Sequence, residues 1–273
     1  YKPLDLGAEG IINMQIAEFD VDDLADGTGK APITFIGKEL LKTPHRMNPS
    51  LVTNVDGTYK EGTGSIGGWE KSEMRSYLKE TVDPLICDVI RDRLAEVTKI
   101  QEANDIYGNI YEQTTHDIIW IPGYLEISEY NKLFKNKTDK IKYIVGTDSA
   151  STWSLRNTRI TFKERFDSVQ PDGEFQVSLS LNTFRIALSF CLRGPREITD
   201  TWEEIFAAEA DGTYKEKYQI SDYKPLDLGD EGIINMQIAA FDADDKADGT
   251  GKAPITWIGR ELPKTFHRMN PKF

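Results

Sequence analysis

Apolar residues follow a helical period in the first half of the chain and mostly a strand period in the second half. Helical spacing predicts helices over residues 69–80, 84–97 and 125–134. Residues 175–181 alternate between apolar and polar, which is typical of a half-buried antiparallel strand. Other short apolar runs predict strands over residues 117–122, 143–145, 152–156, 159–163 and 184–192. Early helices followed by a cluster of antiparallel strands indicate an α+β fold.

One segment of the chain occurs twice. Residues 1–51 align without gaps to residues 223–273, and ten of the 51 aligned positions differ. Each copy is expected to begin with a strand, Ile11–Phe19 or Ile233–Phe241, and residues 31–41 predict a second strand that runs into a short helix. Because the offset of 222 residues is about the length of a domain, we expect a tandem array of domains.

This repeat divides the chain into three predicted parts. Residues 1–200 form a domain, residues 201–222 a helical connector, and residues 223–273 the start of the next copy. Asp200, with Glu203 three residues later, predicts a capping box at the start of the connector helix. The second copy lacks the helices and later strands of the first, so its strand edges are expected to need a partner.

Composition and charge narrow the classes of function. A net charge of −12 argues against non-specific binding to nucleic acid, which requires basic patches. The chain has no run of 18 apolar residues, so membrane insertion is not expected. Cys87 and Cys191 fall in a predicted helix and a predicted apolar strand, and we expect both to be buried free thiols.

Catalytic and metal-binding residue types are present, but their spacing favours structural roles. The acidic loop after the first strand departs from a calcium-binding loop, and its second copy carries Lys246, so we expect a solvated hairpin loop. His45 and Arg46 are expected to hydrogen-bond the loop that follows them. The three histidines do not complete a nucleophile–histidine–acid set. We therefore expect no enzyme, metal or cofactor.

The late strands contain a mixture of aromatic, arginine and short polar residues. Such mixtures are common on recognition surfaces, although a sheet with one solvated face would show the same pattern. The candidate ligand-binding residues are Trp153, Arg156, Asn157, Arg159, Thr161, Lys163, Gln176, Ser178, Ser180 and Asn182.

Four segments carry a family resemblance: GGWEKSEMRSYL (67–78), WIP (120–122), TWSLRN (152–157) and IALSFCL (186–192). With them the chain resembles a bacterial domain family of uncharacterised function that is repeated in large surface-exposed proteins of gut Firmicutes and in their phages. The resemblance implies a C-type-lectin-like fold, as in the variable proteins of diversity-generating retroelements and the formylglycine-generating enzyme. It places residues 157–163 and 176–182 on or near a ligand-binding face. The enzyme branch uses catalytic cysteines and metal, and Cys191 alone does not match that arrangement.

Together these features predict a non-enzymatic ligand-binding module of a repetitive surface adhesin or phage tail-associated protein. Its expected location is extracellular, on a cell surface or a virion, and its expected partners are a glycan or protein receptor and the neighbouring repeats. The alternative is a structural spacer or self-assembling filament subunit whose partner is the next repeat.

Overall fold

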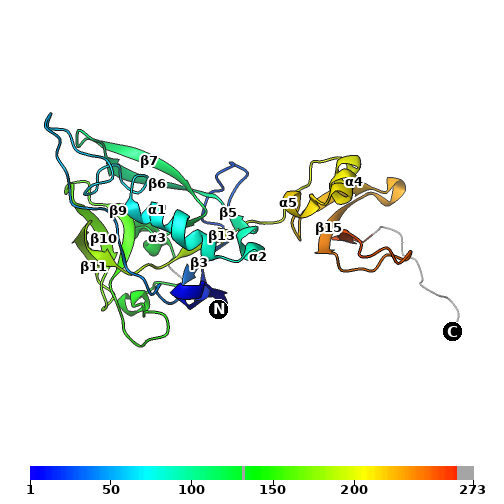
Figure 1. The fold of residues 1–273 in the computed structure, drawn as a ribbon, viewed down its shortest axis with the longest axis horizontal. Coiled ribbons are helices and arrows are strands. Elements are labelled where there is room, and N and C mark those ends of the chain that lie inside the picture. The colour runs from blue at the N-terminus through cyan, green and yellow to red at the C-terminus, as the bar shows by residue number, and fades with distance from the viewer. Residues whose placement is uncertain (131–132, 263–273) are drawn as a thin grey trace. The chain divides into compact units, whose positions relative to one another are not determined.

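The computed structural model describes residues 1–130 and 133–262, and the chain forms two compact units (Figure 1). The first unit is Tyr1–Arg193 and the second is Gly194–Phe273. The boundary therefore falls before the predicted one at residue 200, and the predicted connector belongs to the second unit. Both units are mixed α+β, with more strand than helix, and their named strands pair antiparallel. None of the described helices is long and apolar enough to cross a membrane.

The largest sheet of the first unit has six strands in the order β1-β2-β3-β13-β5, and β8 also pairs with β13. Its strands are β1 (Lys2–Asp5), β2 (Ile11–Phe19), β3 (Ile33–Gly37), β5 (Leu94–Ala95), β8 (Ile119–Trp120) and β13 (Ser189–Leu192). No helix follows β3, contrary to the prediction for residues 31–41. The backbone of Leu40 instead hydrogen-bonds that of Tyr143 and Val145, which draws the chain back onto the domain.

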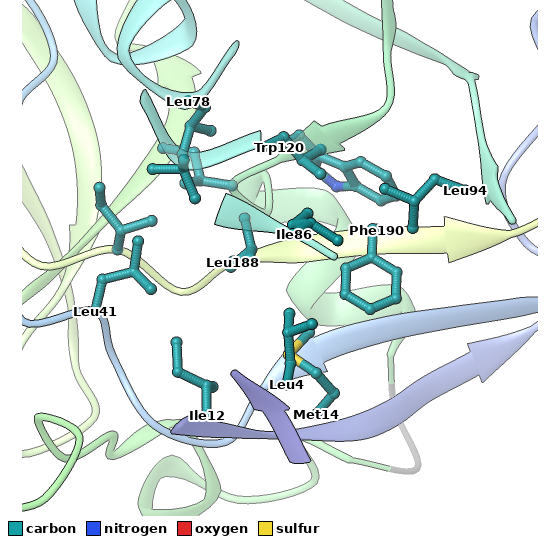
Figure 2. Close-up of a cluster of buried hydrophobic side chains, with 14 of the residues drawn as sticks. Leu4, Ile12, Met14, Leu41, Leu78, Ile86, Leu94, Trp120, Leu188 and Phe190 are labelled. Atoms are coloured by element: carbon teal, nitrogen blue, oxygen red, sulfur yellow. The ribbon is translucent and has the colours of Figure 1, made fainter. Parts of the chain in front are cut away.

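The larger of the two buried apolar clusters described in the first unit lies between this sheet and a short helical segment. In Figure 2 the side chains of Leu4 and Met14, from β1 and β2, lie against Phe190 of β13. Leu78 comes from the helical segment, Ile86 directly follows it, and both belong to the same buried cluster. At about 25 cal/mol per Å² of apolar surface, this burial is the main stabilising contribution in the unit.

The helices are shorter than their apolar spacing predicts. Ser72 caps α1 (Glu73–Tyr77), which continues as a π-helical turn at Leu78–Val82 and a 3-10 turn at Asp83–Leu85. The backbone is then extended at Ile86 and Cys87 before α2 (Asp88–Arg91). The predicted helix over residues 84–97 is therefore wrong in its second half. Pairing of β5 with β13 claims the residues that continued the helical pattern.

One hairpin of the first unit was not predicted from the sequence. β6 (Val97–Asn104) and β7 (Ile110–Asp117) pair over eight positions. The inward-facing positions of β6 include Lys99 and Gln101, which are 2 % and 7 % exposed. Because polar side chains occupy buried positions, the alternation of apolar and polar residues that marks a strand is missing.

The late strands form a three-stranded sheet, β11-β10-β9. They are β9 (Trp153–Thr158), β10 (Arg165–Val169) and β11 (Phe175–Leu179); α3 (Tyr124–Glu129) precedes them, and β12 (Thr183–Phe184) pairs with β4 (His45–Arg46). The strand predicted over residues 159–163 is wrong, because these residues turn the chain from β9 into β10. The backbone N–H of Phe162 closes that turn onto the Arg159 carbonyl at 2.7 Å.

The segment HRMNP (residues 45–49) links β4 to α1. Arg46 forms an ion pair with Glu73, 2.9 Å apart, and the His45 ring stacks on Tyr77. Asn48, rather than His45 or Arg46, makes the predicted link to the following loop, because its amide donates to the Gly64 carbonyl. The segment is structural, but its two basic residues bind the helix.

The described part of the second unit, residues 194–262, contains two α-helices and a three-stranded sheet. α4 (Trp202–Asp211) and α5 (Tyr214–Lys217) precede β14 (Tyr223–Asp227), β15 (Ile233–Phe241) and β16 (Ile255–Gly259). The capping box lies one residue later than predicted, at Thr201 and Glu204, because Asp200 accepts a hydrogen bond from the Tyr218 hydroxyl. The register of β14-β15-β16 matches that of β1-β2-β3, including the irregularity near the end of the long strand.

Candidate functional site

Four charged side chains meet inside the first unit and form what we call the buried ion cluster: Asp22, Lys99, Glu126 and Arg156. They come from the acidic loop, β6, α3 and β9, and each is less than 10 % exposed. Lys99 pairs with both carboxylates, and its ammonium lies 2.8 Å from Glu126. Glu126 also pairs with Arg156. The Lys99 ammonium is 3.8 Å from the centre of the Trp120 ring, a cation–π geometry.

The cluster is stable only as a set. Burial raises the pKa of Glu126, but the charges of Arg156 and Lys99 outweigh burial and lower that pKa to about 2. Glu126 also caps α3, because its second oxygen accepts the backbone N–H of Gly123 at 2.8 Å. The cluster therefore ties α3 to β6 and β9 through one carboxylate.

Cys191 borders the cluster, but its surroundings suppress thiolate chemistry. Its sulfur lies 3.3 Å from the Asp22 carboxylate and 3.2 Å from the Thr34 hydroxyl. Burial, followed by the charge of Asp22, raises the pKa of the Cys191 thiol well above its ordinary value. A nucleophilic cysteine requires the opposite, an environment that stabilises the thiolate.

The two cysteines are expected to react differently with a thiol reagent. Cys87 is exposed, contrary to the expectation of a buried thiol, whereas Cys191 is buried as expected. In the folded protein we expect one thiol per chain to be modified, and a second only after unfolding, as measured by reagent absorbance. Cys87→Ser should remove the native reaction, and two fast thiols in the wild type would contradict the structure.

Three carboxylates of the acidic loop have partners within the protein. Asp22 is buried in the ion cluster, so the loop is not fully solvated as predicted. Asp23 pairs with Lys30 at 2.8 Å, and Asp26 accepts hydrogen bonds from the Thr28 hydroxyl and N–H. Within residues 1–130 and 133–262, no group of three or more His, Cys, Asp or Glu side chains is placed to hold a metal ion.

Several predicted ligand-binding residues are buried, and the structure corrects their assignment. Trp153 is fully buried, and its indole N–H donates to the Lys140 carbonyl at 3.1 Å. Arg156 is 4 % exposed in the ion cluster. Ser178 and Ser180 are 6 % and 1 % exposed. The mixture of residue types that suggested a recognition surface therefore serves in part to hold the late sheet against the core.

The remaining predicted residues lie at or near the surface. Arg159, Thr161 and Gln176 are exposed, whereas Asn157, Lys163 and Asn182 are partly buried. Asn157 accepts the backbone N–H of Tyr124 at the start of α3, which gives it a structural role. Of the exposed members, Arg159 and Thr161 lie in the turn between β9 and β10, and Gln176 lies on β11.

This turn carries cations close to aromatic rings. Arg165 lies 5.4 Å from the ring centre of Phe162, Lys163 lies 4.6 Å from Tyr59, and Arg159 lies 5.9 Å from Tyr124. We call these six residues the basic–aromatic surface. Phe162 is 55 % exposed. The guanidinium of Arg159 also pairs with the buried carboxylate of Asp167 at 2.6 Å.

Sequence reasoning missed Tyr59 and Tyr124 because neither is near the turn in the chain. Tyr59 reaches it through a loop whose backbone pairs with Ile106, beside the unpredicted hairpin. Phe162 was missed because the prediction of a strand over residues 159–163 did not include the turn that exposes its side chain.

A groove, which we call the apolar groove, lies beside the large sheet. Its volume is about 480 Å³, and its wall is mostly apolar. The sheet contributes Phe35 and Met14, and α2 contributes Val89 and Ile90. Lys2 and Arg93 add the charged groups.

Comparison with known proteins adds no relative: no family model, no curated protein and no solved structure matches the chain.

Proposed function

We propose that the chain is a non-enzymatic ligand-binding module of a repetitive extracellular protein and that it binds through the basic–aromatic surface. The main support for this proposal is the turn between β9 and β10, where three cations lie over aromatic rings in a chain of net charge −12. Arginine and aromatic side chains contribute much of the binding energy at recognition surfaces. The receptor is a glycan or a protein that carries negative charge.

We also propose that the first unit has a C-type-lectin-like fold and is one repeat of a tandem array. The late sheet, preceded by helices, is consistent with a C-type-lectin-like domain, and the matching registers of the two copies support a tandem array. A surface adhesin or a phage tail-associated protein, on a cell surface or a virion, would use such a module. The buried ion cluster supports a non-enzymatic role, because its charges neutralise one another and the neighbouring Cys191 thiol is held protonated.

Binding to glycan and protein arrays tests the ligand-binding function. We expect a ligand whose affinity falls at least about tenfold in Phe162→Ala and in Lys163→Gln, a loss of roughly 1.4 kcal/mol. Phe206→Ala is the matched control, because Phe206 is 57 % exposed and lies in the second unit. Binding should also weaken with added salt. A ligand that binds all variants equally, or the absence of any ligand, would contradict the proposal.

A second candidate function, structural assembly, is favoured by β16. Among the described residues β16 pairs only with β15, whereas its counterpart β3 also pairs with β13. Ile258 is 58 % exposed, whereas the equivalent Ile36 is fully buried. An uncovered edge of this kind invites a partner strand. Light scattering over a range of concentrations tests assembly, and a monomer at every concentration would exclude it for this chain.

A further inference from the structure

The repeated three-stranded sheet is covered differently in the two units. In the second unit one face of β14-β15-β16 carries Ile238, Ile255 and Trp257, and α4 and α5 pack on that face. Trp202 of α4 meets Trp257 edge to face at 5.3 Å, and Lys224 lies over the Trp202 ring at 5.7 Å. We call it the connector-bound face.

The connector also binds this sheet through its backbone. Before α4, residues 196–198 run parallel to the start of β14: the N–H of Ile198 donates to the Tyr223 carbonyl at 2.7 Å, and the N–H of Tyr223 donates to the Arg196 carbonyl at 2.9 Å. After α5, the Asp222 carbonyl accepts the N–H of Ile238 at 2.8 Å. The segment Gly194–Asp222 thus covers both an edge and a face of the sheet.

The first unit has the same surface, but different elements lie beside it. Ile16, the counterpart of Ile238, is 45 % exposed, whereas Ile238 is fully buried. Among the described residues β1 is an edge strand, and Tyr1, the counterpart of Tyr223, is 77 % exposed. The counterparts of Lys224 and Trp257 are Lys2 and Phe35, and both line the apolar groove.

The residues that receive the connector are almost the same in the two copies. Seven residues of the second copy bond to the connector or pack against it, and only Trp257 has a different counterpart, the aromatic Phe35. The seven are Tyr223, Lys224, Ile238, Phe241, Asp242, Ile255 and Trp257. The groove of the first unit is large enough for an indole, and it lies where Trp202 lies on the second copy.

We propose that the first unit carries a docking site for a connector with the sequence of Gly194–Asp222, supplied by a neighbouring repeat. Its residues 196–198 extend the sheet at β1, its Trp202 enters the apolar groove, and its two helices cover Ile16. The pairing resembles strand addition combined with a helix in a groove. The interaction joins successive repeats, and it does not depend on the ligand-binding function proposed above.

The test adds a second connector to the full chain. The sequence Gly194–Asp222 is placed directly before Tyr1, at the spacing it has before Tyr223, and hydrogen exchange is followed by mass spectrometry. We expect exchange in peptides covering β1 and β2 to slow at least about tenfold relative to the original chain. Trp202→Ala in the added connector should reverse most of this protection.

A matched pair of substitutions decides whether the face itself is the site. Ile16→Glu should abolish the added protection. Ile11→Glu should leave it, because Ile11 is 58 % exposed and its counterpart Ile233 is still 67 % exposed beside the connector. Equal effects of the two substitutions, or no protection in the extended chain, would overturn the proposal. It would also be overturned if the original chain formed a dimer that Ile16→Glu dissociates, because the occupant would then be a second first unit.

Discussion

Replacing Glu126 by glutamine is expected to lower the free energy of unfolding of the first unit by about 3–5 kcal/mol, the usual cost of removing one partner from a buried ion pair. Arg156 would keep a buried positive charge without its carboxylate, and Lys99 would lose one of its two carboxylate partners. The change is measured by chemical denaturation, with hydrogen exchange used to monitor unfolding of the first unit. Glu129→Gln is the control, because Glu129 lies exposed on the same helix.

The difference between wild type and Glu126→Gln should also depend on pH. The pKa of Glu126 lies at about 2 in the folded protein, below the ordinary value of 4.5. A lowered pKa of this kind stabilises the fold above pH 4.5, and the stabilisation is lost as the pH falls toward 2. The two unfolding free energies should therefore converge between pH 4.5 and pH 2. A constant difference over that interval would show that the carboxylate charge is not the source of the effect.

The same substitution at two equivalent positions is expected to have very different effects on the free energy of unfolding. Ile238→Glu should lower the free energy of unfolding of the second unit by at least about 3 kcal/mol, because it removes a fully buried side chain and introduces a charge. Ile16→Glu should change the free energy of unfolding of the first unit by less than about 0.5 kcal/mol, because that side chain is already 45 % exposed. The sequence around both positions, MQIA, is identical.

Hydrogen exchange resolves the two units within one chain and so measures both effects. In Ile238→Glu, the amides of β15 should lose protection, while those of β2 and β13 keep it. Ile233→Glu, at an exposed position of the same strand, should be harmless. Loss of protection throughout the chain would show that the units do not fold independently.

The parts of the fold that could be predicted from sequence are those whose apolar pattern matches their environment. β2 and β15 have the predicted bounds, and each strand buries part of its apolar residues, Ile12 and Met14 in β2 and Ile234 and Ile238 in β15. The hairpin of β6 and β7 could not be predicted, because Lys99 takes a core position and is stabilised there by partners 77 and 27 residues away. Long-range ion pairing leaves no local pattern.

The candidate site shows the same limit. Trp153 and Arg156 are residue types that are common on recognition surfaces. Whether they are buried depends on the other elements that pack against them. For Arg156 that element is α3, which supplies Glu126. Exposure of Phe162 depends on a turn whose residues also suit a strand. Residue types alone could therefore identify the region of the late strands but not its exposed members.

The position of β13 also determines the order in which the protein can be completed. This strand is the last of the first unit to be synthesised, yet it occupies the middle of the sheet, between β3 and β5. The nascent chain can form the β1–β3 meander early, but its sheet cannot close until Leu192 has left the ribosome. Because the contact joins residues more than 150 positions apart, closure is expected to be the slow step. In an array, each repeat would pass through such an open intermediate, in which β3 is not yet paired with β13.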